Sequence, residues 1–179
     1  MLVTLMLFGV IAGALIVTFT MSQRAFISAD AAVYVQQQAR QALMQMTQEL
    51  RQAGGVVVAA GNQLTIQLDL GYNLAGPCPA NAVCWGARDQ AGAAQSGWSI
   101  RYRLNGTQLV RELLNAAAVV QPGTRVLAND VSQSTFTYVA ATRTITIQLQ
   151  VRRASSQIAG GGINASPTPL VTTIRLRNP

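Results

Sequence analysis

The chain of 179 residues contains no histidine and no lysine, has only two cysteines, and carries charge on only 11% of its residues. Histidine is the commonest general base and metal ligand, so its absence excludes Ser-His-Asp and Cys-His catalysis and ordinary zinc or non-haem iron sites. Two cysteines are too few for a structural zinc site or an iron–sulfur cluster. We therefore expect a protein that is not an enzyme and that holds no metal or cofactor.

Acidic residues are also scarce, at six in the whole chain. A membrane-anchored enzyme without histidine would depend on carboxylates, and the candidates are Asp69, Asp89, Glu112 and Asp130. None of them pairs with another along the sequence. We therefore expect all four at solvated positions in loops or at strand edges.

The 13 arginines give a formal net charge of +7, which favours nucleic acid or anionic lipid as a partner. The arginines are scattered, however, and Arg101-Tyr102-Arg103 is a small basic–aromatic patch that can stack on a base. The same residues fit a strand whose arginines face water while Tyr102 faces the core. We favour the strand, so nucleic acid is an unexpected partner, and a salt-insensitive interaction would dismiss it.

The N-terminal segment Met1–Thr20 has no charge, and its length matches the hydrocarbon thickness of a bilayer. The first charge is Arg24, whose long side chain can reach lipid headgroups. A secretory signal would have a basic start, a shorter apolar run and a small-residue cleavage site, and these are missing. We expect this segment to be retained as a membrane anchor. Gly9 and Gly13 form a small-xxx-small pair that allows another helix to approach, although glycine is also simply common in membrane helices.

The helix is expected to continue beyond the membrane, because Met21–Ala53 contains neither proline nor glycine and is rich in helix formers. Apolar residues recur there at three- and four-residue spacing, which predicts one face packed on a sheet. The packing residues on this face are Val35, Ala39, Ala42, Met46 and Leu50. Gly54-Gly55 is expected to end the helix. This divides the chain into a helix, 1–53, with a membrane half at 1–23 and an amphipathic half at 24–53, and a β domain, 54–179.

The β domain is expected to consist of short antiparallel strands, which makes the fold α+β. Alternating apolar and polar residues predict strands at Leu64–Leu70, Trp98–Leu104, Gln108–Leu113, Ile145–Val151 and Leu170–Arg177, with a broken strand over Val126–Val139. Asn105-Gly106 predicts the two-residue turn of a hairpin. Gly71 to Gly97 is expected to be a turn-rich loop, and Ala159–Pro169 a loop rich in glycine and proline.

Cys78 and Cys84 lie within the first of these loops. An exported location favours a disulfide between them, worth about 2 kcal/mol in the chain-entropy model. The alternative is two unpaired buried thiols. A redox role would need a CxxC-like arrangement, which is absent.

This organisation resembles the type IV pilins and pseudopilins, in which an apolar N-terminal helix continues into an amphipathic one and an antiparallel sheet. The helix end is similar to the minor-pilin branch in particular, as is the pattern of the following strands. The matching segments are 35–43, 48–54, 104–111, 129–131 and 136–138. The resemblance implies a long N-terminal helix packed on a C-terminal antiparallel sheet.

The resemblance also implies how the subunit is processed and assembled. A prepilin peptidase would cut just before Met1 and the new amine would be methylated. Subunits would wait in the inner membrane, and an assembly platform protein with its motor would stack identical copies into an extracellular helical filament. Such filaments serve adhesion, motility, uptake or secretion. The residues expected to pack in the filament core are Leu2, Leu5, Phe8, Gly9, Gly13 and Ile16.

The chain differs from the usual family pattern at two positions, and these differences bear on whether it is a major structural subunit or a low-copy one. The family usually has a glutamate at the fifth position, where this chain has Thr4 and Leu5, and often a proline near Ser22. Some minor pilins at filament tips lack the acid. Alternatively, residues precede Met1 and Thr4 itself replaces the glutamate. The expected function is a structural pilin subunit, and the alternative is a low-copy minor pilin or type II secretion pseudopilin that primes or caps the filament.

Overall fold

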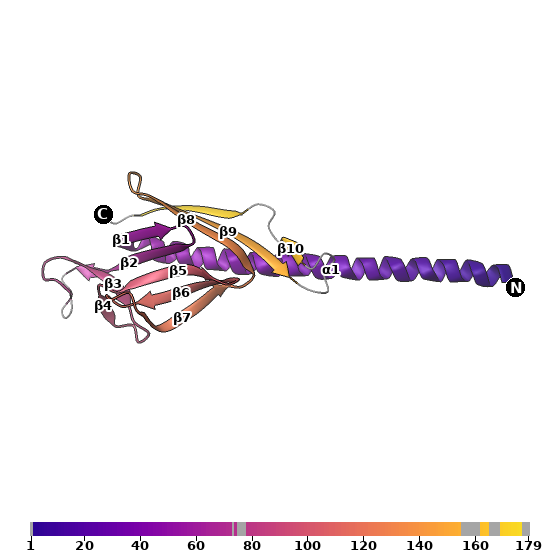
Figure 1. The fold of residues 1–179 in the computed structure, drawn as a ribbon, viewed down its shortest axis with the longest axis horizontal. Coiled ribbons are helices and arrows are strands. Elements are labelled where there is room, and N and C mark those ends of the chain that lie inside the picture. The colour runs from indigo at the N-terminus through magenta and orange to yellow at the C-terminus, as the bar shows by residue number, and fades with distance from the viewer. Residues whose placement is uncertain (1, 73, 75–77, 155–161, 165–168, 177–179) are drawn as a thin grey trace.

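In the computed structural model one helix, α1 (Leu2–Arg51), runs into a domain of β-strands (Figure 1). The structure describes residues 2–72, 74, 78–154, 162–164 and 169–176. At 1.5 Å a residue, the 50 residues of α1 extend for about 75 Å. The helix was predicted to extend to Ala53, before Gly54-Gly55, but it ends two residues earlier at Arg51, because Ala53 and Gly54 already pair with Leu68 and Gln67 of a strand. Only Gln52 therefore separates the end of α1 from the first strand residue, Ala53.

All the strand pairs among the described residues are antiparallel, and they form two sheets. The larger sheet contains β1 (Ala53–Ala60), β2 (Gln63–Tyr72), β3 (Val83–Arg88), β4 (Ala94–Ser96), β5 (Ser99–Asn105), β6 (Gln108–Leu114) and β7 (Val120–Ala128). The smaller sheet contains β8 (Val131–Val139), β9 (Thr144–Ala154), β10 (Gly162–Asn164) and β11 (Leu170–Arg175). The α+β architecture follows from these elements.

Each sheet is organised around one long strand. In the larger sheet β2 pairs with β1 along one edge, and with β5 and then β3 along the other. In the smaller sheet β9 pairs with β8 along one edge, and with β11 and then β10 along the other. The two sheets meet where the backbone amide of Phe136 in β8 donates to the carbonyl of Gly61 at 2.7 Å, in the connection between β1 and β2.

The turn between β5 and β6 corrects one prediction. Asn105 pairs with Gln108, so the two-residue turn is Gly106-Thr107 and not Asn105-Gly106. Gly106 has a φ of 61°, which suits the first central position of a type II′ turn, the position that favours glycine. The predicted hairpin is therefore present, with its turn one residue later than predicted.

Two further segments differ from the sequence expectation. The Gly71 to Gly97 segment contains β3 and β4, and Gly86 makes their pairing possible, because a Cβ at this position would lie 2.1 Å from the carbonyl oxygen of Gln95. The expected loop at Ala159–Pro169 contains β10, and its residues 159–161 and 165–168 lie outside the described residues. Short strands of this kind are not visible as an alternating pattern.

The broken strand predicted over Val126–Val139 is two strands in different sheets. The break falls at Asn129-Asp130, where Asp130 has a φ of 58° and the chain passes from β7 into β8. The amide of Val131 then donates to the carbonyl of Thr107, at the turn of the β5–β6 hairpin, at 2.9 Å. The expected common face of Phe136 and Tyr138 is present, since both pack in or against the core.

The core lies between the C-terminal part of α1 and the two sheets, and α1 contacts strands of both. The alternating strands bury one face, as expected: Leu64 and Ile66 in β2, and Ile145, Ile147, Leu149 and Val151 in β9. Figure 1 shows the N-terminal part of α1 projecting beyond the sheets, with the chain's N-terminus at its far end. We call residues 2–30 of α1 the projecting part; they precede Ala32, the first helix residue packed against the core. The helix thus has one part inside the domain and one part outside it.

Candidate assembly surface on the helix

The projecting part of α1 exposes large apolar side chains all around the helix. Leu2, Phe8 and Phe26, for example, are 79%, 72% and 74% exposed. The helix is long and apolar enough to cross a membrane, with a mean hydropathy of 2.5 over its most apolar window, none of which is buried. Fully burying one Leu or Phe side chain is worth about 1.5–3 kcal/mol. Leaving a surface of this kind in water is therefore costly in free energy.

The residues predicted for the filament core lie on this projecting part. Leu2, Phe8 and Ile16 are exposed, and a Cβ added at Gly9 or Gly13 would meet nothing within 4 Å. The backbone of Leu5 is helical, but its side chain and the whole of Met1 lie outside the described residues. Leu2, Gly9, Gly13 and Ile16 share one helix face by their spacing, and none of the described residues covers this face.

The residues predicted to pack on the sheets have the opposite environment. All five are buried, none with more than 1% of its surface exposed: Val35, Ala39, Ala42, Met46 and Leu50. They form one cluster with side chains of both sheets, such as Ile100 of β5 and Ile147 of β9. The small alanines allow the helix to approach the strands closely, and the β domain thereby holds α1 from Val35 to Leu50.

A polar contact inside this packed face joins α1 to the larger sheet. The Nε of Arg111 in β6 donates to both carboxylate oxygens of Glu49 at 3.0 Å, and the hydroxyl of Tyr102 in β5 donates to the same carboxylate. Tyr102 and Arg111 are cross-strand partners, and the Tyr102 side chain is fully buried. Burial raises the pKa of the Tyr102 phenol well above its usual value, and the Glu49 charge adds to this effect.

A second polar contact lies where α1 leaves the domain. The guanidinium of Arg153 in β9 stands 5.5 Å from the ring centroid of Tyr34 and 3.5 Å from a carboxylate oxygen of Asp130. The amide group of Gln38 donates to the Tyr34 hydroxyl at 2.7 Å, and its oxygen accepts from the backbone amide of Asn129 at 3.3 Å. These contacts hold α1 directly after its projecting part, at the crossover between the sheets.

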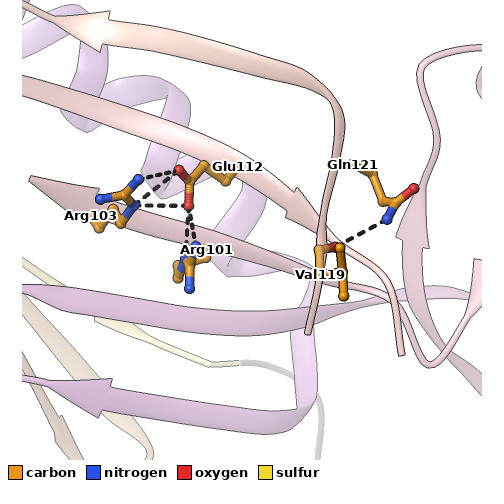
Figure 2. A network of polar contacts seen from close by, with 5 residues as sticks. All are labelled: Arg101, Arg103, Glu112, Val119 and Gln121. Atoms are coloured by element: carbon orange, nitrogen blue, oxygen red, sulfur yellow. Dashed lines mark hydrogen bonds and ion pairs between the residues drawn. The ribbon is translucent and has the colours of Figure 1, made fainter. Parts of the chain in front are cut away.

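A buried carboxylate corrects the expectation that all four candidate acids are solvated. Glu112 in β6 is only 4% exposed, and it accepts hydrogen bonds from Arg101 at 2.6 and 2.8 Å and from Arg103 at 2.7–3.0 Å (Figure 2). The hydrogen bonds from Arg103 are the main cause of the lowered pKa of Glu112, with those from Arg101 adding to it. The pKa of the Arg103 guanidinium is raised by the same contact.

The other three acids are less buried than Glu112. Asp69 is exposed, and Asp89 and Asp130 are half-buried. Asp89 accepts hydrogen bonds from the side-chain amide of Gln95 and from the backbone amides of Ala93 and Ala91. The bond from Gln95 is the main cause of the lowered pKa of Asp89, and together the bonds close the β3–β4 turn. Within the described part of the chain, no three residues among histidine, cysteine, aspartate and glutamate lie close enough to hold a metal ion.

The patch Arg101-Tyr102-Arg103 has the arrangement that strand alternation predicted. Tyr102 faces the core, and both arginines lie on the other face of β5, partly exposed. Their guanidinium groups converge on Glu112, so part of their charge is neutralised by one carboxylate. An aromatic ring on the same face, as base stacking would require, is not supplied by Tyr102.

Cys78 and Cys84 form a disulfide, with their Cα atoms 5.3 Å apart. Cys84 is buried at the second position of β3, whereas Cys78 lies in the connection before it. The bond therefore ties the long β2–β3 connection to the start of β3.

Sequence reasoning missed the polar contacts of Glu49, Tyr34 and Glu112. Glu49 interrupts an otherwise uncharged stretch between Arg40 and Arg51, which is the one signal that the sequence offers for it. Comparisons with protein-family models, with curated proteins and with solved structures gave no match to this chain.

Proposed function

We propose that this chain is a structural subunit of a type IV pilus-like filament and that it polymerises through the projecting part of α1. The observation that supports the proposal most is the division of one continuous helix. Its C-terminal part is buried against two sheets, whereas its N-terminal part exposes apolar side chains on every face. A helix that is apolar all round must be covered by lipid or by other helices.

The same helix can serve both environments in turn. Before assembly, the projecting part anchors the subunit in the inner membrane, and after assembly, neighbouring copies cover it. Both environments are apolar, so the transfer does not require exposure of the segment to water. The low charge of the chain suits a protein whose surface is largely covered by neighbours, since interface cores are poor in charged residues.

A low-copy role at the filament tip is the second candidate, and the start of the helix favours it. Residues 1–29 contain no acidic residue, and Thr4 and Leu5 stand where the resembling family usually has a glutamate. That carboxylate normally attracts the N-terminal amine of a neighbour. A subunit without it lacks one of the contacts that hold a long uniform polymer together.

The experiment is to shear surface fibres from cells that produce this protein, image them and identify their components by mass spectrometry and N-terminal sequencing. A major subunit predicts that this chain is the most abundant component, with a methylated N-terminus. A priming or capping subunit predicts a few copies beside a different major component. Fibres without the chain, or a protein found only as a soluble monomer, would contradict both.

A further inference from the structure

The projecting part of α1 carries a single pair of opposite charges. Arg24 and Asp30 are the only charged residues between positions 2 and 39, and both are exposed. Neither makes a hydrogen bond or an ion pair within the part of the chain that the structure describes. They are six residues apart, and side chains on a helix meet at a spacing of three or four. The two charges are therefore available to partners outside the chain.

Their positions on the helix are fixed by its geometry. Asp30 lies about 9 Å further along the axis than Arg24, and about 120° around it. At 100° a residue, Asp30 points about 160° away from the centre of the buried face that runs from Val35 to Leu50, whereas Arg24 lies within about 40° of it. Arg24 precedes Val35 by about 16 Å, so it lies on the sheet side of the helix but ahead of the packed residues.

Parallel copies of this helix cannot lie side by side in equal register without placing like charges at the same height. A shift of about 9 Å along the axis instead brings Asp30 of one copy level with Arg24 of the next. Because the two charges lie on different faces, each copy can offer Asp30 to one neighbour and Arg24 to another. Such a contact joins two different surfaces, and repeating it produces an open polymer instead of a closed pair.

We propose that Arg24 and Asp30 form an ion pair between adjacent copies of this chain and set the axial stagger of the polymer. This inference rests on the proposed pilus-like function and names the contact that determines its register. A charge enclosed by apolar helices is costly when it is unpaired, so the pairing disfavours every other register. It would supply the register contact that an acid near the N-terminus of the helix would otherwise make.

The test is charge exchange in cells that carry the full chain. Arg24→Asp alone and Asp30→Arg alone each place like charges across the contact, and we expect the yield of sheared fibres to fall about tenfold or more. The double variant R24D/D30R restores opposite charges, so its yield should return to within about twofold of the wild type. Arg40→Asp, which alters an exposed arginine beside the sheets, serves as the matched control and should leave the yield unchanged.

The double variant also separates a contact between copies from an effect inside one chain. Co-expressed with the wild type, R24D/D30R should form its own fibres and exclude the wild-type chain, because every mixed contact places two carboxylates or two guanidinium groups opposite each other. Equal membrane levels and equal thermal stability of the β domain are checked for every variant. Free mixing of the two chains, or full fibre yield from either single variant, would overturn the pairing. Rescue of Asp30→Arg by Arg40→Asp instead of Arg24→Asp would show a different stagger and would also overturn it.

A crosslinking measurement gives an independent answer. The two native cysteines form a disulfide, so cysteines placed at positions 24 and 30 are the only free thiols. Fibres of the double variant R24C/D30C treated with a short bismaleimide should give a ladder of covalent multimers, whereas either single variant should stay monomeric. Fibres that form normally but give no ladder contradict the pairing alone. If the wild-type chain enters no fibre at all, the proposed function fails instead.

Discussion

The two parts of α1 share one backbone but have opposite environments. From Val35 to Leu50 every apolar residue of the packed face is buried, whereas Phe8 and Phe26 on the projecting part are 72% and 74% exposed. Intrinsic helix propensity is lower in the projecting part, which is rich in Val, Ile, Thr, Phe and Gly, than in the packed part, which is rich in Ala, Gln, Met and Leu, yet both parts are helical. The difference lies in the side-chain pattern, since an apolar stripe fits one sheet surface while an all-round apolar surface fits only lipid or a bundle. One helix can thus bury one part against its own β domain and leave the other part free to be covered by other molecules.

The largest contrast is expected between Met46→Ala and Phe26→Ala. Met46 is fully buried, so its truncation leaves a cavity and should lower the free energy of unfolding by about 2–5 kcal/mol. Phe26 is 74% exposed, so its truncation should change the free energy of unfolding by about 0.5 kcal/mol or less, and reduce fibre yield instead. Denaturant titration of the detergent-solubilised subunit, together with fibre yield, measures both effects. Equal destabilisation by the two variants would remove the distinction between the parts.

The next effect concerns the polar contact that joins the packed part to the sheet. Glu49→Ala leaves Arg111 and the buried Tyr102 hydroxyl without their acceptor and should cost about 1–3 kcal/mol of stability. Tyr102→Phe removes the hydroxyl itself, so no buried donor is left without an acceptor, and it should lower the free energy of unfolding by less than Glu49→Ala does. The pKa of Tyr102 is raised in the folded protein. The contribution of the protonated Tyr102 phenol to the free energy of unfolding is therefore complete below pH 10 and is lost as the pH rises above that value.

Unfolding measured between pH 8 and 11 checks this prediction. The wild type should lose stability in the alkaline part of the range, and Tyr102→Phe should lose less of it. A Tyr102→Phe variant with the full alkaline loss would show that other groups cause it.

Glu112 gives a smaller effect at the opposite end of the pH scale. Its pKa is lowered from 4.5 in the folded protein, so its contribution to stability is present above pH 4.5 and is lost as the pH falls below it. Glu112→Gln should lower stability at pH 7 and flatten this acid dependence, while fibre yield stays unchanged because Glu112 does not lie on α1. Thermal unfolding between pH 2.5 and 7 measures the slope, and an unaltered acid dependence would contradict the assignment.

The smallest effect is expected at Ser134 in β8. Its hydroxyl oxygen is buried and has no hydrogen-bond partner among the residues that the structure describes. Ser134→Ala removes that unsatisfied group and should be neutral or stabilise the domain by up to about 1 kcal/mol. A clear loss of stability in thermal unfolding would show that the hydroxyl is satisfied in solution.

The sequence pattern was sufficient for the elements that have a strong period. Spacing of three and four residues identified every buried residue of the packed face, and strict alternation identified β2 and β9 with the correct faces inward. The contrast between the two parts of α1 is of the same kind. It follows from residue type and spacing, and both can be read from the sequence.

Register and cross-strand contacts were not predictable in the same way. Placing the hairpin turn at Gly106-Thr107 instead of Asn105-Gly106 moves every partner in β6 by two residues, and this puts Glu112 opposite Arg101 and Arg111 opposite Tyr102. The two polar contacts of the hairpin therefore depended on a turn that the Asn-Gly signal placed one residue too early. β3 and β4 were missed because their pairing depends on the absence of a side chain at Gly86, not on alternation.

The most direct test replaces residues 2–23, which make up most of the projecting part of α1, with a cleaved export signal, so that the rest of the chain is exported without them. The account predicts that this product folds as a soluble domain with its Cys78–Cys84 disulfide formed, and that cells with it as their only copy display no fibres containing it. Normal fibres built from the truncated product would contradict the claim that the projecting part of α1 is the surface of assembly.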